Sequence, residues 1–223
     1  MITINEFHQL FDISEELASE LLMGAKVMDV EEGTVLVKQG SAPTHVIFVI
    51  DGVIGGVRET YDGSARMNAL MTKGRIAAES GVIQDLRYYG SFSAFADSRV
   101  VLVDIEHAKH VLAQNREFLE LLLRSQTSKL KYATMVHYAS TERDKLAKVA
   151  AILEGISDFS DLDEIPLSKE QLAGLLGMSR NTVSQSLKTL EDRGAILQQK
   201  SNIVILNKNK LSLDGSNSKL FEC

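Results

Sequence analysis

The stretch MSRNTVSQSLKTLEDRG, from Met178 to Gly194, decides the fold of the C-terminal part of the chain. Its apolar residues Val183, Leu187 and Leu190 are spaced four and three residues apart, which is the spacing of one buried face of a helix. The positions between them are mostly polar. The pattern predicts a helix that begins at Arg180, is anchored by its apolar face and presents hydrogen-bonding side chains on the other face.

A second predicted helix lies just before this one. Ser168 and Gln171 form a capping-box pattern that opens the segment KEQLAGLLG, and Gly177 ends it. Two short helices joined by a turn with a glycine are typical of a helix-turn-helix, whose second helix enters the major groove of DNA. After Gly194, AILQQ and NIVILN predict a hairpin beside the helices. We therefore predict a winged helix-turn-helix that binds double-stranded DNA.

The predicted DNA contacts are the polar residues of these two helices. Base edges in the groove display donors and acceptors, so the residues that read them must form hydrogen bonds, and lysines neutralise phosphates. The alternative is a polar surface helix in an unrelated bundle. The candidate DNA-binding residues are Ser168, Lys169, Ser179, Arg180, Asn181, Thr182, Ser184, Gln185 and Lys188.

The distribution of charge supports the DNA contact. The chain has 223 residues and a net charge of −6. Residues 166–210 contain seven basic and three acidic residues, a net +4, so the rest of the chain sums to −10. A basic island in an acidic protein indicates where a polyanion binds.

Targeting signals and cysteine pairs are missing from the sequence. No apolar run approaches the ~20 residues of a membrane span, and the N-terminus MITINEFHQLFDIS lacks the pattern of a secretory signal. The single cysteine, Cys223, has no partner for a disulfide and cannot by itself hold an iron–sulfur cluster. We expect a cytoplasmic protein without a membrane partner.

The segment from about Lys26 to Ile105 carries the signature of an antiparallel β-roll. Glycines separate the short runs TVLVK, HVIFVI, VIGGVRET, RMNALM and SRVVLVDI, and turn signals recur between them. Asp62-Gly63 predicts a hairpin turn. Before the roll, Ser14 is the predicted N-cap of a short helix in residues 13–25.

A long helical pattern follows, from Glu106 to Ser140, interrupted near Asn115. One of its stripes repeats at alternating four- and three-residue steps, which is the spacing of a dimer seam. This predicted dimer seam consists of Leu119, Leu123, Gln126, Leu130, Ala133 and His137. A second apolar stripe consists of Phe118, Leu121, Leu122 and Ser125. The alternatives are a homodimer on the seam or two stripes of ordinary core, and His137 is either a pH-sensitive contact or a partly buried polar residue.

The fold class is therefore α+β, with an N-terminal jelly-roll-like antiparallel β-roll, a long dimerisation helix and a C-terminal winged helix-turn-helix. The predicted domains are residues 1–105, 106–140 and 141–223. Thr141 with Asp144 predicts the start of a further helix that ends at Gly155. The acidic loop from Ser157 to Glu164 is either a contact for RNA polymerase or a solvated linker.

Taken together, these features resemble the Crp/Fnr family of bacterial transcription regulators. The motifs that carry the resemblance are Gly33, Gly40, Val49 and Asp51-Gly52, the GRIAAE stretch from Gly74 to Glu79, and LSKEQLAGLLGMSRNTVSQSLKTLEDRGAI. The resemblance implies a cyclic-nucleotide-binding-like roll that senses a signal and a helix-turn-helix that reads DNA.

The roll departs from the cyclic-AMP-binding members of that family. Those members have an Arg-Ser pair that clamps the phosphate, and here Gly90-Ser91 stands in its place. A buried phosphate without a cation is costly. Arg87 is a candidate substitute, and Thr134 stands where such members have a hydroxyl for the adenine. The candidate effector pocket is Glu79, Ser80, Arg87, Gly90, Ser91 and Thr134.

The cofactor expectations follow from the same comparison. We expect no cyclic AMP, no haem and no iron–sulfur cluster, because the phosphate clamp, an axial-ligand motif and a cysteine cluster are all missing from the sequence. His107 and His110 form a helical pair that we read as a solvated face. The effector is unknown. A constitutive regulator with an empty or self-filled roll and a cyclic-nucleotide-responsive regulator stay alternatives.

The predicted function is a homodimeric regulator on a near-palindromic DNA site. Asn181 and Gln185 stand where familiar members have glutamate and arginine, and amides pair best with adenine, so we expect A·T-richer half-sites. An enzyme built on the roll is the competing class. The roll has His45 but no H-x-H pair, and the chain has no P-loop and no GxGxxG, so we expect no enzyme.

Overall fold

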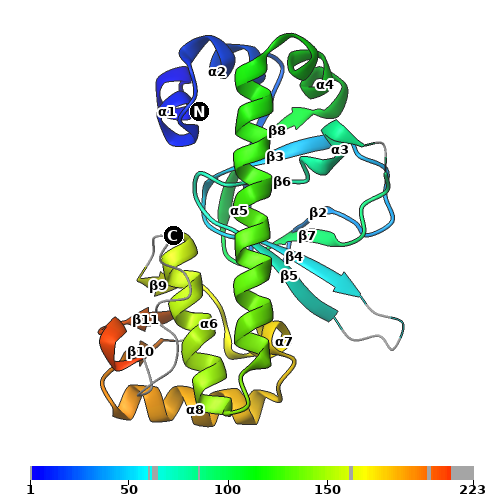
Figure 1. Cartoon of the computed structure of the whole chain (residues 1–223). Coiled ribbons are helices and arrows are strands. Elements are labelled where there is room, and N and C mark those ends of the chain that lie inside the picture. The colour runs from blue at the N-terminus through cyan, green and yellow to red at the C-terminus, as the bar shows by residue number, and fades with distance from the viewer. Residues whose placement is uncertain are drawn as a thin grey trace. The chain divides into compact units, whose positions relative to one another are not determined.

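The computed structural model describes residues 2–59, 61, 65–84, 86–160, 163–199 and 202–211. The chain divides into two units, Met1–Lys129 and Leu130–Cys223. The boundary lies within the long helix α5 (Arg116–Thr141), which Figure 1 shows in green. Each unit is described by itself below.

The first unit is built on two four-stranded antiparallel sheets. One has the order β1-β8-β3-β6 and the other the order β2-β7-β4-β5. In the first sheet, Val46 lies opposite Val103 and Phe48 opposite Val101. The strands are β1 (Lys26–Val30), β2 (Val35–Val37), β3 (His45–Asp51), β4 (Ile54–Glu59), β5 (Ala65–Met71), β6 (Ile76–Ala77), β7 (Ser91–Ala94) and β8 (Ser98–Asp104). This arrangement confirms the predicted antiparallel roll.

Strand β3 is apolar along most of its length because both of its faces are buried. Ile47 and Val49 point into a core shared by the two sheets. Val46 and Phe48 point into a second core against the helices. The centroids of the Phe48 and Phe7 rings are 5.2 Å apart. Side chains of a strand alternate between its faces, so the run HVIFVI supplies both cores at once.

The described residues of this unit also form four helices and one short helical turn. They are α1 (Ile4–Phe11), α2 (Glu15–Leu22), α3 (Ser80–Ile83), α4 (Ile105–Gln114) and the first half of α5. The Ser14 hydroxyl accepts a hydrogen bond from the Leu17 amide, which confirms the predicted N-cap of α2. The predicted interruption at Asn115 is also confirmed, because that residue separates α4 from α5.

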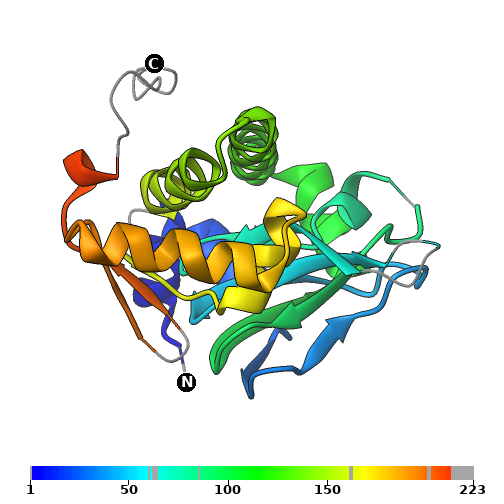
Figure 2. The ribbon, with the colours of Figure 1, turned by 90° about the horizontal axis from the view of Figure 1, so that it is seen from below.

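The second unit contains the predicted helix-turn-helix and wing. Its elements are α6 (Lys145–Ser160), β9 (Glu164–Ile165), α7 (Lys169–Leu176), α8 (Arg180–Asp192), β10 (Ile196–Gln198), β11 (Ile203–Ile205) and the 3₁₀ turn η1 (Lys208–Lys210). Strands β10 and β11 pair antiparallel, and β9 adds to the other side of β11. In Figure 2, α8 (orange) extends toward the two wing strands at its C-terminal end.

Some local predictions are wrong. The helix expected from Thr141 to Gly155 begins instead at Lys145, with the Asp144 carboxylate accepting from the Ala147 amide, and Thr141 is the last residue of α5. Gly155 does not end the helix, because α6 continues to Ser160. A Cβ at position 155 would lie 2.3 Å from the Met135 sulfur. Position 155 is a glycine because α6 packs closely against Met135 there.

The acidic loop is also shorter than predicted. Ser157 to Ser160 belong to α6, and Glu164 lies in a strand. The sequence reading did not include α1, β1, β6, β7 or α3. The predicted Asp62-Gly63 turn lies outside the described residues, as do Lys200 and Ser201, which connect AILQQ to NIVILN in the predicted hairpin.

Candidate nucleic-acid interface and candidate effector pocket

Helix α8 is held by one face and exposed on the other. Val183, Leu187 and Leu190 are fully buried. The α7 leucines Leu172, Leu175 and Leu176 are buried as well. Arg180, Asn181, Gln185 and Lys188 are exposed, and Ser184 is half-buried. The two faces predicted from the sequence are therefore those that the structure has.

Several candidate DNA contacts also cap the helices. Ser168 and Gln171 form a reciprocal capping box at the start of α7. The Ser179 hydroxyl accepts from the Thr182 amide and lies 2.8 Å from the Thr182 hydroxyl. Gly177 ends α7 with φ 62°, a left-handed conformation that glycine adopts without strain. These side chains fix the angle at which α8 leaves the turn.

The candidate cations of this unit differ in their surroundings. Arg180 Nε lies 2.7 Å from Glu170 Oε1, with both side chains more than half exposed. Lys188 is exposed and Lys169 is half-buried. The structure thus places Ser179 and Thr182 at the turn and Arg180, Asn181, Gln185 and Lys188 on the exposed face of α8. Ser168 and Lys169 lie at the start of α7, which the Glu170–Arg180 pair joins to the start of α8.

The acidic segment before β9 is partly neutralised within its own unit. Lys208 Nζ lies 3.0 Å from Asp158 Oδ1 and 4.0 Å from Asp163 Oδ1. Burial raises the pKa of the nearby Glu154, and the negative charge of Asp158 adds to that effect. A contact between this segment and RNA polymerase stays a prediction.

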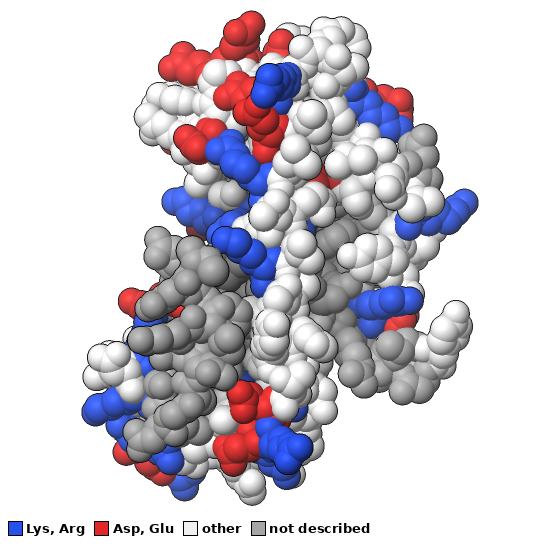
Figure 3. Space-filling view, in the orientation of Figure 1, with Lys and Arg blue, Asp and Glu red and all other residues white. Residues whose placement is uncertain are grey.

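The predicted dimer seam on α5 is exposed, whereas the second stripe is buried. The exposed fractions of Leu119, Leu123 and Leu130 are 41%, 54% and 68%. Ala133 and His137 are also exposed, and Gln126 is half-buried. Phe118 and Leu122 are fully buried. Figure 3 shows a stripe of uncharged side chains over α5. The exposure of the seam contradicts the reading of both stripes as ordinary core, and the homodimer itself stays a prediction.

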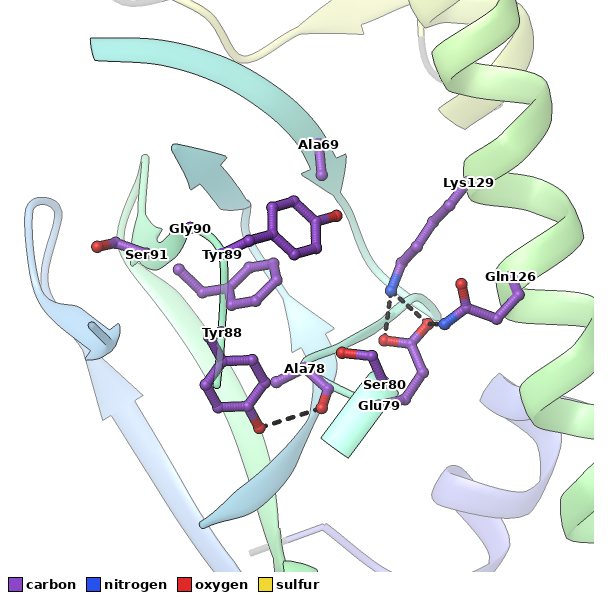
Figure 4. Close-up of a pocket in the computed structure, with 11 residues that line it drawn as sticks. Ala69, Ala78, Glu79, Ser80, Tyr88, Tyr89, Gly90, Ser91, Gln126 and Lys129 are labelled. Atoms are coloured by element: carbon purple, nitrogen blue, oxygen red, sulfur yellow. Dashed lines mark hydrogen bonds and ion pairs between the residues drawn. The ribbon is translucent and has the colours of Figure 1, made fainter. Parts of the chain in front are cut away.

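A pocket lies between the second sheet of the roll and the unit's part of α5 (Figure 4). It has a cavity volume of about 150 Å³. The residues that line it are Ala69, Ala78, Glu79, Ser80, Tyr88, Tyr89, Gly90, Ser91, Phe92, Gln126 and Lys129. Of the candidate pocket residues, the structure thus brings together Glu79, Ser80, Gly90 and Ser91.

Two candidate pocket residues are not among those that line it. The guanidinium of Arg87 donates to the Gly40 carbonyl at 2.9 Å, and its side chain is exposed. It therefore does not replace the missing phosphate clamp in this structure. Thr134 belongs to the other unit, where its hydroxyl donates to the Leu130 carbonyl at 2.8 Å.

The cation that the pocket does contain is Lys129, which the sequence reading missed. Its ammonium donates to both carboxylate oxygens of Glu79. Burial lowers the pKa of Lys129, and the Glu79 carboxylate opposes this lowering. Burial, with Glu79 adding to it, raises the pKa of Tyr88 to about 12. Fifty positions of sequence separate Glu79 from Lys129, so no local motif announces the pair.

The histidines are dispersed through the first unit and α5. His107 was predicted on a solvated face, but its Nε2 lies 2.8 Å from the Glu20 carbonyl oxygen and the residue is half-buried. His110 is exposed. Within the described residues, no three His, Cys, Asp or Glu side chains gather as a metal site.

Comparisons with known proteins agree with this architecture. A cyclic nucleotide-binding domain model matches residues 27–115, and a Crp-like helix-turn-helix domain model matches residues 146–213. None of the helices in the described part of the chain has the length and apolar character to cross a membrane. No curated protein matches the chain.

Solved structures show the same fold at low sequence identity. FixK2 from Bradyrhizobium japonicum is 18% identical, with a TM-score of 0.72, covering 84% of this chain and 95% of its own. CLP, described as a c-di-GMP-responsive global regulator of Xanthomonas campestris, is 14% identical with a TM-score of 0.68, covering 86% and 99%. A CRP-family transcriptional regulator from Thermus thermophilus is 16% identical with a TM-score of 0.68, covering 82% and 94%.

Proposed function

We propose that this chain, which belongs to the Crp/Fnr family of transcription regulators, binds a near-palindromic DNA site as a homodimer through α8. The observation that carries the proposal is the two-sided character of α8. Its apolar face is buried, while Arg180, Asn181 and Gln185 are exposed and carry hydrogen-bonding groups. Such a helix presents donors and acceptors to base edges without losing its anchor.

The homodimer supplies a second α8 for the second half-site. Leu119, Leu123 and Leu130 leave apolar surface exposed on α5, and a second copy of the same stripe covers it in a two-fold arrangement. In such dimers the two recognition helices enter successive major grooves, with half-sites ~34 Å apart. Lys169 and Lys188 supply phosphate contacts, which add affinity without sequence preference.

The effector of this regulator is not cyclic AMP. Gly90 offers no guanidinium to a cyclic phosphate, and the ammonium of Lys129 is already paired with Glu79. The cavity of about 150 Å³ is also below the ~300 Å³ at which small-molecule pockets begin. We propose that the chain uses neither haem nor an iron–sulfur cluster. The families matched are regulators, so no enzymatic activity is proposed.

In vitro selection from a random DNA pool, with purified protein and no added ligand, tests this function. We expect a near-palindrome whose half-sites are richer in A·T pairs at the positions read by Asn181 and Gln185. The matched control is Asn181→Ala, which keeps the fold and relaxes the preference at one position, at a cost of about 1 to 3 kcal/mol. A G-rich half-site contradicts the base assignment. Sequence-blind, salt-sensitive binding alone contradicts ligand-free specific binding.

A second candidate function is a constitutive regulator that needs no effector. The pairing of Glu79 with a side chain of its own chain favours it over a regulator with an unfamiliar ligand. Binding to the selected site in the absence of any small molecule distinguishes the two.

A further inference from the structure

The buried carboxylate of Glu79 is fully occupied by side chains of α5. The exposed fraction of the Glu79 side chain is 1%. Its Oε1 accepts from the Ser125 hydroxyl at 2.8 Å and from the Gln126 amide at 3.0 Å. The Lys129 ammonium donates to both oxygens. A buried carboxylate with these donors has its charge and its hydrogen bonds satisfied without any external molecule.

The backbone before Glu79 is held in an unusual conformation that aims this carboxylate. Ala78 has φ 63°, a region that residues with a side chain rarely adopt. Its carbonyl accepts a hydrogen bond from the Tyr88 hydroxyl at 3.2 Å. A few residues earlier, the Arg75 guanidinium donates to the Ser128 hydroxyl at 2.6 Å. Both ends of the segment from Arg75 to Glu79 therefore attach to the same stretch of α5.

Figure 4 shows how Lys129 enters the pocket. It extends from α5 toward Glu79, and the segment with Tyr88, Tyr89 and Ser91 lines the opposite side. The Lys129 side chain is 25% exposed, so its ammonium reaches the site from the rim. The position thus holds a primary ammonium, bound by a carboxylate beside aromatic walls.

We propose that Lys129 is the ligand of this pocket, supplied by the chain itself, and that the pocket recognises a primary alkylammonium group. The proposal rests on the proposed function for its regulatory meaning. The bound ammonium attaches α5 to the roll and keeps the regulator in its DNA-binding arrangement without an external effector. It also leaves no free cation among the described lining residues for an anionic nucleotide.

The attachment reaches the predicted dimer seam through Gln126. This residue is a seam position and also a donor to Glu79. Its neighbours along the seam in this unit, Leu119 and Leu123, lie two turns and one turn before it on the same helix. Fixing Gln126 therefore fixes the rotation of α5 and the face that it offers to a second copy.

Chemical rescue tests the proposal. Lys129→Ala removes the side-chain atoms that propylammonium has, so propylammonium fits the vacated space and restores the hydrogen bonds to Glu79. Tetramethylammonium has the same charge but no N–H group, and it is the matched ligand control. Lys131→Ala, at an exposed position of α5, is the matched protein control. The readouts are the midpoint of thermal unfolding and the affinity for the selected DNA site.

We expect Lys129→Ala to lower the unfolding midpoint and to weaken DNA binding about tenfold or more, because it leaves a buried charge unpaired. Propylammonium raises both values toward those of the wild type, and tetramethylammonium does not. Neither cation changes the unfolding midpoint or the DNA affinity of Lys131→Ala. Cyclic AMP leaves the unfolding midpoint of the wild type unchanged. If Lys129→Ala does not fold in buffer, refolding it in propylammonium gives the same readout. The double variant Glu79→Gln with Lys129→Met then serves as a reference that propylammonium does not affect.

Three results overturn the proposal. The first is a Lys129→Ala variant with wild-type unfolding and wild-type DNA affinity. The second is equal rescue by tetramethylammonium, and the third is stabilisation of the wild type by cyclic AMP. Rescue of unfolding without a change in DNA affinity overturns the regulatory role alone. Loss of specific DNA binding by the wild type contradicts the proposed function, while the unfolding measurements still decide whether Lys129 is the ligand.

Discussion

Arg180 at the first position of α8 is joined to Glu170 in the first turn of α7, with 2.7 Å between Nε and Oε1. The pair connects the two helices of the helix-turn-helix across their turn. It also places a carboxylate beside the one arginine at the N-terminus of the predicted recognition helix. In the proposed complex with DNA, Arg180 would exchange this carboxylate for acceptors on the DNA.

Glu170→Gln is expected to tighten DNA binding by roughly two- to fivefold. An exposed ion pair of this kind is worth about 0.2 to 1 kcal/mol, and the substitution also removes a negative charge next to the phosphates. Fluorescence anisotropy with a labelled duplex measures the change. Asp192→Asn removes a charge from the other end of α8 without contacting Arg180, and it is expected to have the smaller effect. Weaker binding by Glu170→Gln would show that the carboxylate orients Arg180 for base contact.

Leu123→Glu is expected to weaken self-association by about a hundredfold and to abolish tight DNA binding. The residue is 54% exposed, so the carboxylate costs little in an isolated chain but is buried without a partner in a dimer. Sedimentation equilibrium measures the association constant. Lys131→Glu places the same charge on an exposed position of α5 outside the predicted seam. A dimer that survives Leu123→Glu and is lost with Lys131→Glu would place the interface elsewhere.

Gly52→Ala is expected to cost roughly 3 kcal/mol of unfolding free energy, against about 1 kcal/mol for Gly33→Ala. Both glycines have positive φ, 81° and 87°, so the backbone strain of the alanine is similar. A Cβ on Gly52 would lie 2.5 Å from the Asp97 carbonyl oxygen, whereas a Cβ on Gly33 would have nothing within 4 Å. Urea unfolding measures the loss of unfolding free energy in each variant. The difference between the two losses gives the cost of the steric contact at Gly52 beyond the backbone strain. Equal losses would show that strain alone sets the cost.

The unfolding free energy is expected to fall as the pH decreases below the ordinary histidine pKa of 6.5, with His45 as one cause. Burial lowers the pKa of His45, and Asp104 on the neighbouring strand opposes this. The unfolded chain therefore takes up the proton first, so the stabilisation is present above pH 6.5 and is lost as the pH falls through the lowered value. His45→Gln is expected to flatten the dependence between about pH 7.5 and about pH 5.5.

Urea unfolding at several pH values measures this effect, and His110→Gln, at an exposed histidine of α4, is the matched control. A wild-type profile that stays flat in this range would remove His45 as a contributor. The difference between the His45 and His110 variants, rather than the wild-type profile alone, carries the test.

Local sequence signals predicted most of the secondary structure because they act over a few residues. The caps at Ser14 and Ser168 each satisfy an amide within the next turn, and both were predicted from the sequence. The cap of α8 at Ser179 acts in the same way but was not predicted. The missed helix α1 has the same kind of signal, since Thr3 and Glu6 form a capping box. Gly155 misled the reading because its role, close contact with Met135, depends on another helix.

The pocket was harder to predict for the same physical reason. Glu79, Ser80, Gly90 and Ser91 were found through a family motif, whereas Gln126 and Lys129 come from a helix whose distance from the roll no local pattern encodes. The heptad spacing assigned Gln126 to the dimer seam and gave Lys129 no role. Only the tertiary fold shows that the two side chains share one carboxylate.

If Lys129 is the ligand of the pocket, as proposed, the hydrogen bonds from α5 to Glu79 and the 2.6 Å hydrogen bond between Arg75 and Ser128 give the first unit a sensor whose occupant never leaves by diffusion. An occupant on the same chain has an effective concentration that is set by geometry and does not vary with metabolism. The output of such a regulator then follows the number of its own molecules. Synthesis and degradation of the protein would then set when it acts, as a rising or falling metabolite does for a ligand-controlled regulator.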